Sequence, residues 1–175
     1  MKRIYFSLFI ISVFLFSCND NDTIEISTSI PIPIAVQVSE SAVSHQESGQ
    51  VEYSFTASQT YHLSDNEDVK NYLDHMNYIA FKEQSFGISG LEDGEVIKYI
   101  ELSAGDDNNF ITFENVTNSN YGTEGSNSNP AYGLVANVLL TDKEITVTVS
   151  GTTNKAPMDF DIDLVFQIAV HTEEI

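Results

Sequence analysis

Apolar and polar residues alternate over two long stretches of the chain, one near each end. The first runs from Ile24 to Val38 and the second from Met158 to Val170, and in both the apolar residues fall on even positions. A period of two places such side chains on one face of an extended chain. Each stretch is therefore predicted to form a strand with one buried face.

The first of these strands carries two prolines, Pro31 and Pro33, on its polar parity. Proline has no N–H group to donate to a neighbouring strand, so it is confined to edges and breaks. The stretch 24–38 is therefore expected to be an edge strand, or two strand pieces separated by a break.

Shorter strands are predicted in the middle of the chain, at 51–61, 78–88, 95–102, 110–116 and 144–150. The apolar phase of 78–88 changes from odd to even around Lys82, which predicts a bulge. The stretch 95–102 is apolar on both parities and is expected to lie centrally in a sheet. The strand 144–150 and the strand that begins at Met158 are joined by a turn at 151–157, which predicts a hairpin at the core of the fold.

Two helices are predicted between these strands. Ser64 and Glu67 form a capping-box pattern at the start of the first, and its apolar residues follow at three- and four-residue spacing: Val69, Tyr72, Leu73 and Met76. Acidic residues in its first turn suit the helix dipole better than they suit a calcium loop. Asn129 and Pro130 predict the start of the second, which ends at 141–143. Its apolar stripe is expected to comprise Leu134, Val135, Val138 and Leu139.

Two polar stretches are expected to connect the strands. The segment 39–50 is predicted to be a loop or a hairpin connection. The segment 118–129, which is rich in Ser, Asn and Gly, is predicted to be a surface loop, with a binding site as the alternative.

About seven short strands at regular spacing, with two short crossover helices, predict a mainly β fold, an immunoglobulin-like antiparallel β-sandwich. The cysteine and tryptophan residues of antibody domains are absent from the sequence, so only the architecture is inferred. One such domain is expected at 24–175.

The N-terminus has the pattern of an export signal. A basic start, Met1-Lys2-Arg3, precedes an apolar run from Ile4 to Phe16, and Leu15-Phe16-Ser17-Cys18 closes it. The run is too short for a transmembrane helix, which needs about 20 apolar residues. A small residue before the cut completes a secretory signal. A plain secretory signal is the alternative, but it would leave Cys18, the one cysteine, as a free thiol.

The cysteine directly after Ser17 makes this stretch resemble the lipobox of bacterial lipoproteins. The resemblance implies removal of 1–17 by cleavage between Ser17 and Cys18, a diacylglyceryl group on the Cys18 thiol, and acylation, such as by palmitate, of the new N-terminus. It also implies a small β-sandwich lipoprotein held by this lipid in the outer membrane of a Gram-negative bacterium.

Residues 18–23 are expected to be an acidic tether. Asp20 and Asp22 resemble the acidic signal that directs some lipoproteins to the outer face, so exposure at the cell surface is favoured over a periplasm-facing position. A solvated linker is the alternative. Asp22-Thr23-Ile24 also resembles an O-glycan acceptor in the same bacteria.

Charge narrows the range of partners. The chain has 7 basic and 26 acidic residues, a net charge of -19. Loss of Lys2 and Arg3 with the signal leaves 5 basic and 26 acidic residues, a net charge of -21. Such a surface repels phosphate backbones, so nucleic acid is not expected as a partner. Attachment to the membrane is expected from the lipid, with an envelope protein or glycan as partner.

No residue pattern in the sequence indicates a catalytic or metal site. The four histidines, His45, His62, His75 and His171, lack metal-ligand spacing, and there is no nucleophile-elbow or phosphate-loop motif. No catalytic residue and no cofactor besides the lipid on Cys18 is therefore predicted.

Asp159, Asp161 and Asp163 are expected on one face of the last strand, about 7 Å apart in succession. They are interpreted as a solvated sheet face, with a weak calcium site completed by other loops as the alternative. A binding or adhesion module is the favoured function, ahead of a structural or accessory subunit of an envelope complex. A hydrolase is the third alternative.

Overall fold

The computed structural model describes residues 23–47, 50–105, 109–117, 121–126 and 130–173. Strands make up most of this part of the chain, together with one α-helix and two short 3-10 turns. The strands are β1 (Thr23–Val38), β2 (Val43–Glu47), β3 (Gln50–His62), β4 (Met76–Ser89), β5 (Ile97–Ala104), β6 (Asn109–Val116), β7 (Tyr121–Ser126), β8 (Glu144–Thr153) and β9 (Met158–Glu173). The helix α1 spans Pro130–Asp142, and the 3-10 turns span Leu63–Asp65 and Leu73–His75.

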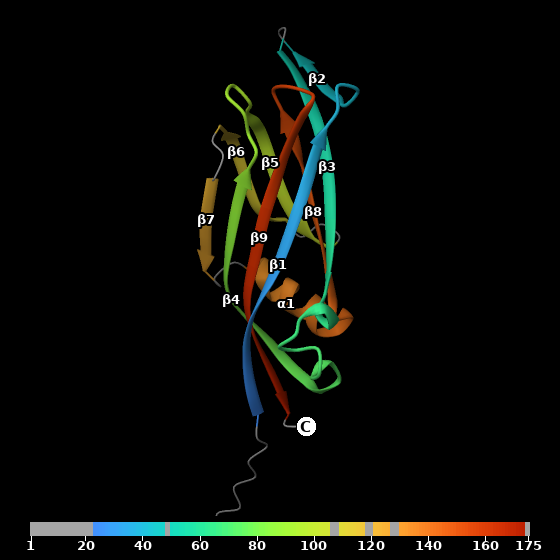
Figure 1. The fold of residues 1–175 in the computed structure, drawn as a ribbon, viewed down its shortest axis with the longest axis vertical. Helices are drawn as coiled ribbons and strands as arrows, with labels where there is room; N and C mark the ends of the chain where they lie inside the picture. Colours follow the sequence, from blue (N-terminus) through green and yellow to red (C-terminus); the bar gives the residue numbers. More distant parts are fainter. Residues whose placement is uncertain (1–22, 48–49, 106–108, 118–120, 127–129, 174–175) are drawn as a thin grey trace, which may run out of the picture.

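Two antiparallel sheets pack face to face (Figure 1). One has the order β1-β9-β4-β7 and the other the order β2-β3-β8-β5-β6. The predicted antiparallel β-sandwich is confirmed. Its connections refine the expected immunoglobulin-like class: with β2 set aside, the strand order is that of a jelly roll, in which two Greek keys fold over each other.

The strands β8 and β9 do not form the hairpin that was predicted. β8 pairs with β3 and β5, whereas β9 pairs with β1 and β4, so the turn between them crosses from one sheet to the other. Each is a central strand of its own sheet. The alternation correctly identified the buried face of each strand. It could not identify the partner, because two strands that face each other across a core show the same pattern as two strands that are paired.

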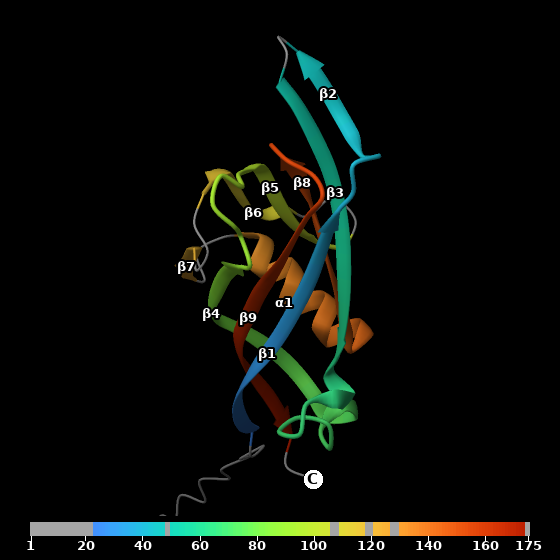
Figure 2. The same cartoon turned by 45° about the horizontal axis from the view of Figure 1, so that its top comes forward.

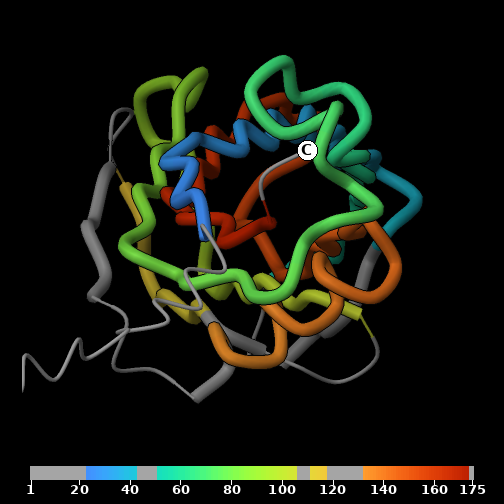
Figure 3. The backbone as a smooth tube through the Cα atoms, turned by 90° about the horizontal axis from the view of Figure 1, so that it is seen from below, coloured from blue at the N-terminus to red at the C-terminus, as the bar shows by residue number. Residues whose placement is uncertain are grey.

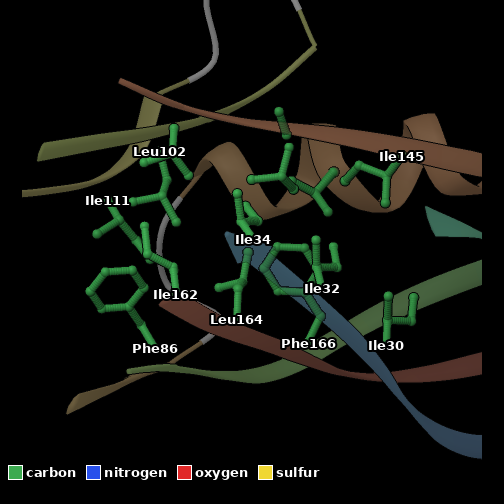
Figure 4. Close-up of a cluster of buried hydrophobic side chains, with 14 of the residues drawn as sticks. Ile30, Ile32, Ile34, Phe86, Leu102, Ile111, Ile145, Ile162, Leu164 and Phe166 are labelled. Atoms are coloured by element: carbon green, nitrogen blue, oxygen red, sulfur yellow. The ribbon is translucent and has the colours of Figure 1, made fainter. Parts of the chain in front are cut away.

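The core lies between the sheets and draws on every long strand (Figure 4). β1 contributes Ile30, Ile32, Ile34, Val36 and Val38, each at most 3% exposed. β9 faces them with Phe160, Ile162, Leu164 and Phe166. Burial of one such side chain stabilises the fold by about 1.5–3 kcal/mol. β1 lies at a sheet edge, as its prolines predicted, and it runs as one strand without a break.

The predicted helix at 64–76 is wrong. This segment forms a series of three-residue turns, in which the N–H groups of Asn66, Val69, Tyr72 and His75 each donate to the carbonyl three residues earlier. Leu63, Asn66 and Val69 are buried, also at a spacing of three. The segment lies at the lower end of the sandwich in Figure 1, and Figure 3 shows that end from below. No side chain caps the turn at Leu63–Asp65, so the predicted capping box does not form. The Asn66 side chain instead donates hydrogen bonds to Thr28 and Ser29 of β1.

Other local predictions are confirmed. The ladder between β4 and β9 shifts between Phe81 and Glu83, so the expected bulge lies at Lys82. β5 lies inside its sheet, between β8 and β6.

The two polar connections contain more structure than was expected, because β2 lies within 39–50 and β7 lies within 118–129.

The helix α1 is confirmed, but its buried face differs from the predicted stripe. Its buried residues are Tyr132, Val135, Ala136 and Leu139, whereas Leu134 is 47% exposed. The helix packs on β4 and β8 at the flank of the sandwich (Figure 2). Apolar residues lie on nearly every side of this helix, so the sequence pattern could not show which side is buried.

Candidate functional site

The residues of the predicted lipid anchor and of its tether lie outside the described part of the chain. These are Cys18, the cleavage residue Ser17, and the acidic residues Asp20 and Asp22 of the tether. Thr23, the expected glycan acceptor, is the first residue of β1 and pairs with Glu173 of β9. The start of β1 therefore lies at the same end of the sandwich as the end of β9 (Figure 1).

The acidic face of β9 is solvent-exposed. Asp159, Asp161 and Asp163 point outward, and their neighbours in register on β1 are Gln37, Ala35 and Pro33. None of these neighbours offers a carboxylate. Within the described residues, no group of three or more histidine, cysteine or acidic side chains is placed to hold a metal ion.

The histidines lie in different parts of the fold. His62 lies 2.8 Å from a carboxylate oxygen of Glu144 at the end of the β3–β8 ladder. His171 lies 3.7 Å from Glu25, and its ring is 5.6 Å from that of Tyr78. His75 is in a 3-10 turn and His45 is in β2. The structure does not bring these four residues together.

A groove of about 390 Å³ lies between β4 and α1. From β4 it is lined by the five consecutive residues 78–82. From α1 it is lined by Tyr132, Gly133, Ala136, Asn137 and Leu140. Figure 2 shows the helix running beside the lower half of β4.

Stacked aromatic rings form the base of this groove. The rings of Phe81 and Tyr132 are parallel, with their centroids 4.3 Å apart, and Phe166 meets Phe81 edge-on at 5.2 Å. Burial raises the pKa of Tyr132 above its ordinary value of 10.0. The phenol is therefore neutral at physiological pH, and the base of the groove is uncharged.

The composition of the groove differs from that of the rest of the surface. Among the described residues that line it there is no carboxylate, although the chain has 26 acidic residues. Its one charged lining group is Lys82, whose ammonium group lies 3.5 Å from Glu25 on β1. Tyr78, which is 58% exposed, supplies an aromatic face open to solvent. Aromatic and aliphatic walls with a few polar groups are typical of binding sites.

Two small helix residues line this groove. Gly133 and Ala136 are three residues apart on α1 and both line the groove. A Cβ atom added at Gly133 would meet nothing within 4 Å, so packing does not require glycine there. Glycine inside a helix costs about 1 kcal/mol relative to alanine. Nothing in the sequence pattern links Gly133 to residues 78–82, so its place in the groove is visible only in the structure.

A second hollow, of about 410 Å³, is polar and lies between β1 and the turns at 63–75. The Thr28 hydroxyl donates to Asp68 at 2.7 Å, and the Asn66 amide donates to Thr28 Oγ1 and to the Ser29 carbonyl, both at 3.1 Å. These polar groups satisfy one another and fasten the turns to β1. The arrangement accounts for the hollow as a structural junction.

No helix in the described residues is long and apolar enough to cross a membrane.

Comparisons with known proteins add little to this geometry. No family model matches the chain, and no curated protein matches it. Among solved structures, a chain titled Desmodium yellow mottle tymovirus is similar, with 10% sequence identity and a TM-score of 0.32. The match covers 85% of this chain and 90% of that chain. A TM-score this low carries no argument about fold or function.

Proposed function

We propose that this protein is a lipid-anchored lipoprotein of the bacterial envelope whose sandwich acts as a binding module. The anchor half of the proposal is supported by the lipobox-like Leu15-Phe16-Ser17-Cys18 and by the basic and apolar residues before it. The binding half is carried by the groove between β4 and α1. Its uncharged aromatic base and exposed Tyr78 suit noncovalent binding, and the described residues of its lining offer no nucleophile beside a general base.

The anchor holds this groove near the lipid surface. Cys18 lies five residues before Thr23, and an extended chain spans at most about 3.6 Å per residue. The end of the sandwich at which β1 begins is then held within roughly 20 Å of the lipid surface. The groove lies near this end, because its lining residue Lys82 is 3.5 Å from Glu25 of β1, two residues after Thr23.

The anchor is tested by mass spectrometry of the mature N-terminus. We expect a peptide that begins at Cys18 and carries acyl mass, and we expect Cys18→Ala to abolish that mass. A mature peptide that begins elsewhere without acyl mass would overturn the anchor. Protease added to intact cells tests orientation, because a surface-exposed domain is digested and a periplasmic one is protected.

The binding site is tested with the protein purified from cells that express the full chain. It is exposed to a glycan array and to a phage-displayed library of random dodecapeptides. We expect at least one of the two to yield a ligand whose binding is lost in Gly133→Leu, a change that fills the groove. No ligand from either source, or ligands that bind Gly133→Leu as well as the original protein, would overturn the groove as the site.

A further inference from the structure

β4 is paired along its whole length on one edge and along half of it on the other. β9 pairs with it from Met76 to Ser89, whereas β7 pairs only with Glu83–Ile88. In the described residues, the edge of β4 from Met76 to Lys82 that faces away from β9 has no strand beside it. Successive residues of a strand direct their N–H and C=O groups to alternate edges. About half of the backbone groups of this segment therefore point away from β9.

The groove follows this free edge. Side chains alternate between the two faces of a sheet, so a hollow on one face is lined by every second residue. Here five consecutive residues, 78–82, line the hollow, which places it along the edge of the strand. The opposite wall is α1, whose interior backbone groups bond within the helix. Among the described residues, no backbone hydrogen bond joins α1 to β4. A row of backbone donors and acceptors therefore faces a groove with apolar walls.

We propose that the groove binds an extended segment of another polypeptide, which adds as a strand to the edge of β4 at Tyr78–Lys82. This inference rests on the proposed binding function and names the class of its ligand. Main-chain hydrogen bonds to an exposed edge supply affinity in this mode of recognition, and alternate side chains supply specificity. Apolar side chains of the segment lie against Tyr132, Ala136 and Leu140.

The features of the edge define the ligand further. The register shifts on either side of Tyr78–Phe81, at Asn77 and at Lys82, so the regular part of the free edge is four residues long. Bulges and lysines are devices by which natural edges avoid pairing with identical copies. A second copy without the signal also carries the same net charge of -21 (5 basic and 26 acidic residues), which opposes self-association. The apolar walls suit a short apolar strand, and the net negative charge of the whole protein favours basic residues on its flanks, outside the groove that Lys82 lines.

The library selection described above decides this point when a matched pair of variants is added. Gly133→Leu places a side chain in the groove, whereas Gly133→Ala adds a Cβ that meets nothing within 4 Å. We expect selected peptides to have apolar residues at alternate positions and Lys or Arg at the flanks. We expect Gly133→Leu to weaken their binding at least tenfold and Gly133→Ala to leave it unchanged. Circular dichroism checks that both variants fold.

Hydrogen exchange distinguishes strand addition from binding through side chains alone. Strand addition protects those backbone amides of Tyr78–Lys82 that point away from β9 when a selected peptide binds, whereas a ligand held only by side chains leaves their exchange rates unchanged. Selected peptides that give no protection there would overturn strand addition.

Three further results would overturn the inference. One is a library without enriched peptides, and another is peptides that bind Gly133→Leu normally. The third is self-association that Gly133→Leu abolishes, which would identify a second copy as the occupant. A glycan ligand without a peptide ligand removes this inference and leaves the binding function in place. If the purified protein binds a peptide but carries no acyl mass, only the proposed lipid anchor is overturned.

Discussion

Asn66 shows how much a single buried polar side chain decides in this protein. Its amide donates two hydrogen bonds to β1, and its side-chain oxygen accepts one from the Asp68 N–H at 3.0 Å. Only 6% of the residue is exposed, so water cannot replace these bonds. Asn66 thus holds the turns at 63–75 against the first strand, in the place where the sequence pattern favoured a helix.

Replacing Asn66 by alanine is expected to lower the free energy of unfolding by about 1–3 kcal/mol, because Thr28 and the Ser29 carbonyl lose buried partners. Urea unfolding measures the loss. Ser64→Ala is the control, since no side chain caps the adjacent turn, and its effect is expected to stay within about 0.5 kcal/mol. A larger loss for Ser64→Ala than for Asn66→Ala would restore the capping-box interpretation.

Tyr99 gives a second prediction at this scale. Its hydroxyl donates to Glu101 at 2.6 Å, and this bond, with burial and the charges of Glu101 and Glu114, raises its pKa above 10.0. The stability that protonated Tyr99 contributes is therefore complete below pH 10 and is lost as pH rises through the folded-state pKa.

Glu101→Gln is expected to lower the pKa of Tyr99 toward its ordinary value, because the ionised acceptor is removed. Absorbance of tyrosinate during an alkaline titration measures this as a difference between variant and original protein. Glu114→Gln should shift the titration less, since the charge of Glu114 is the smallest of the causes. Identical titrations for Glu101→Gln and the original protein would contradict the assignment.

At the scale of elements, the longer strands and the helix α1 were predicted, whereas β2, β7 and the turns at 63–75 were not. Period-two alternation depends only on which face is buried, and each strand has one buried face whatever its partner. The turns at 63–75 and the buried face of α1 depend on contacts with β1 and β4, which lie far away in the sequence. The groove also depends on contacts between distant parts of the chain, because Gly133 and Tyr78 line it together only in the folded protein. Neither residue belongs to a sequence motif that indicates a groove.

The acidic residues of β9 give the prediction for this scale. Asp161 is exposed and lies between Ala35 and Ser89 in register. Asp161→Asn is expected to change the free energy of unfolding by no more than about 0.5 kcal/mol, because surface charges at this spacing are screened. Thermal melts at millimolar calcium and magnesium should agree. A calcium-selective rise that Asp161→Asn abolishes would instead identify a calcium site.

At the scale of the whole molecule, the fold depends on pairings between distant parts of the chain. β1 at the start pairs with β9 at the end, and the two central strands β8 and β9 are both contributed by the last third of the sequence. The sequence predicted the sandwich because its strands are amphipathic. It did not predict the jelly-roll order, since the order is set by which faces and edges fit after collapse.

This dependence makes a sharp prediction about where the folded unit begins. A chain that starts at Thr23 is expected to fold without lipid, with a β-dominated circular dichroism spectrum and cooperative unfolding. A chain that starts at Ser39 lacks β1 and is expected not to fold. The missing strand removes five buried aliphatic side chains, a loss on the order of 10 kcal/mol. Such a loss is comparable to the whole stability of a typical domain.

Adding β1 back as a separate peptide distinguishes loss of a strand from general damage. β1 is an edge strand with a partner in its sheet on one side, so a peptide of residues 23–38 can reach its place without rethreading the chain. We expect the peptide to restore a cooperative transition to the chain that starts at Ser39. A peptide in which Ile30, Ile32 and Ile34 are replaced by serine is the control, because it retains the prolines and the length but loses the buried face. Cooperative unfolding of the shortened chain alone would show that β1 is not part of the folding unit, and equal rescue by both peptides would show that burial is not what holds it.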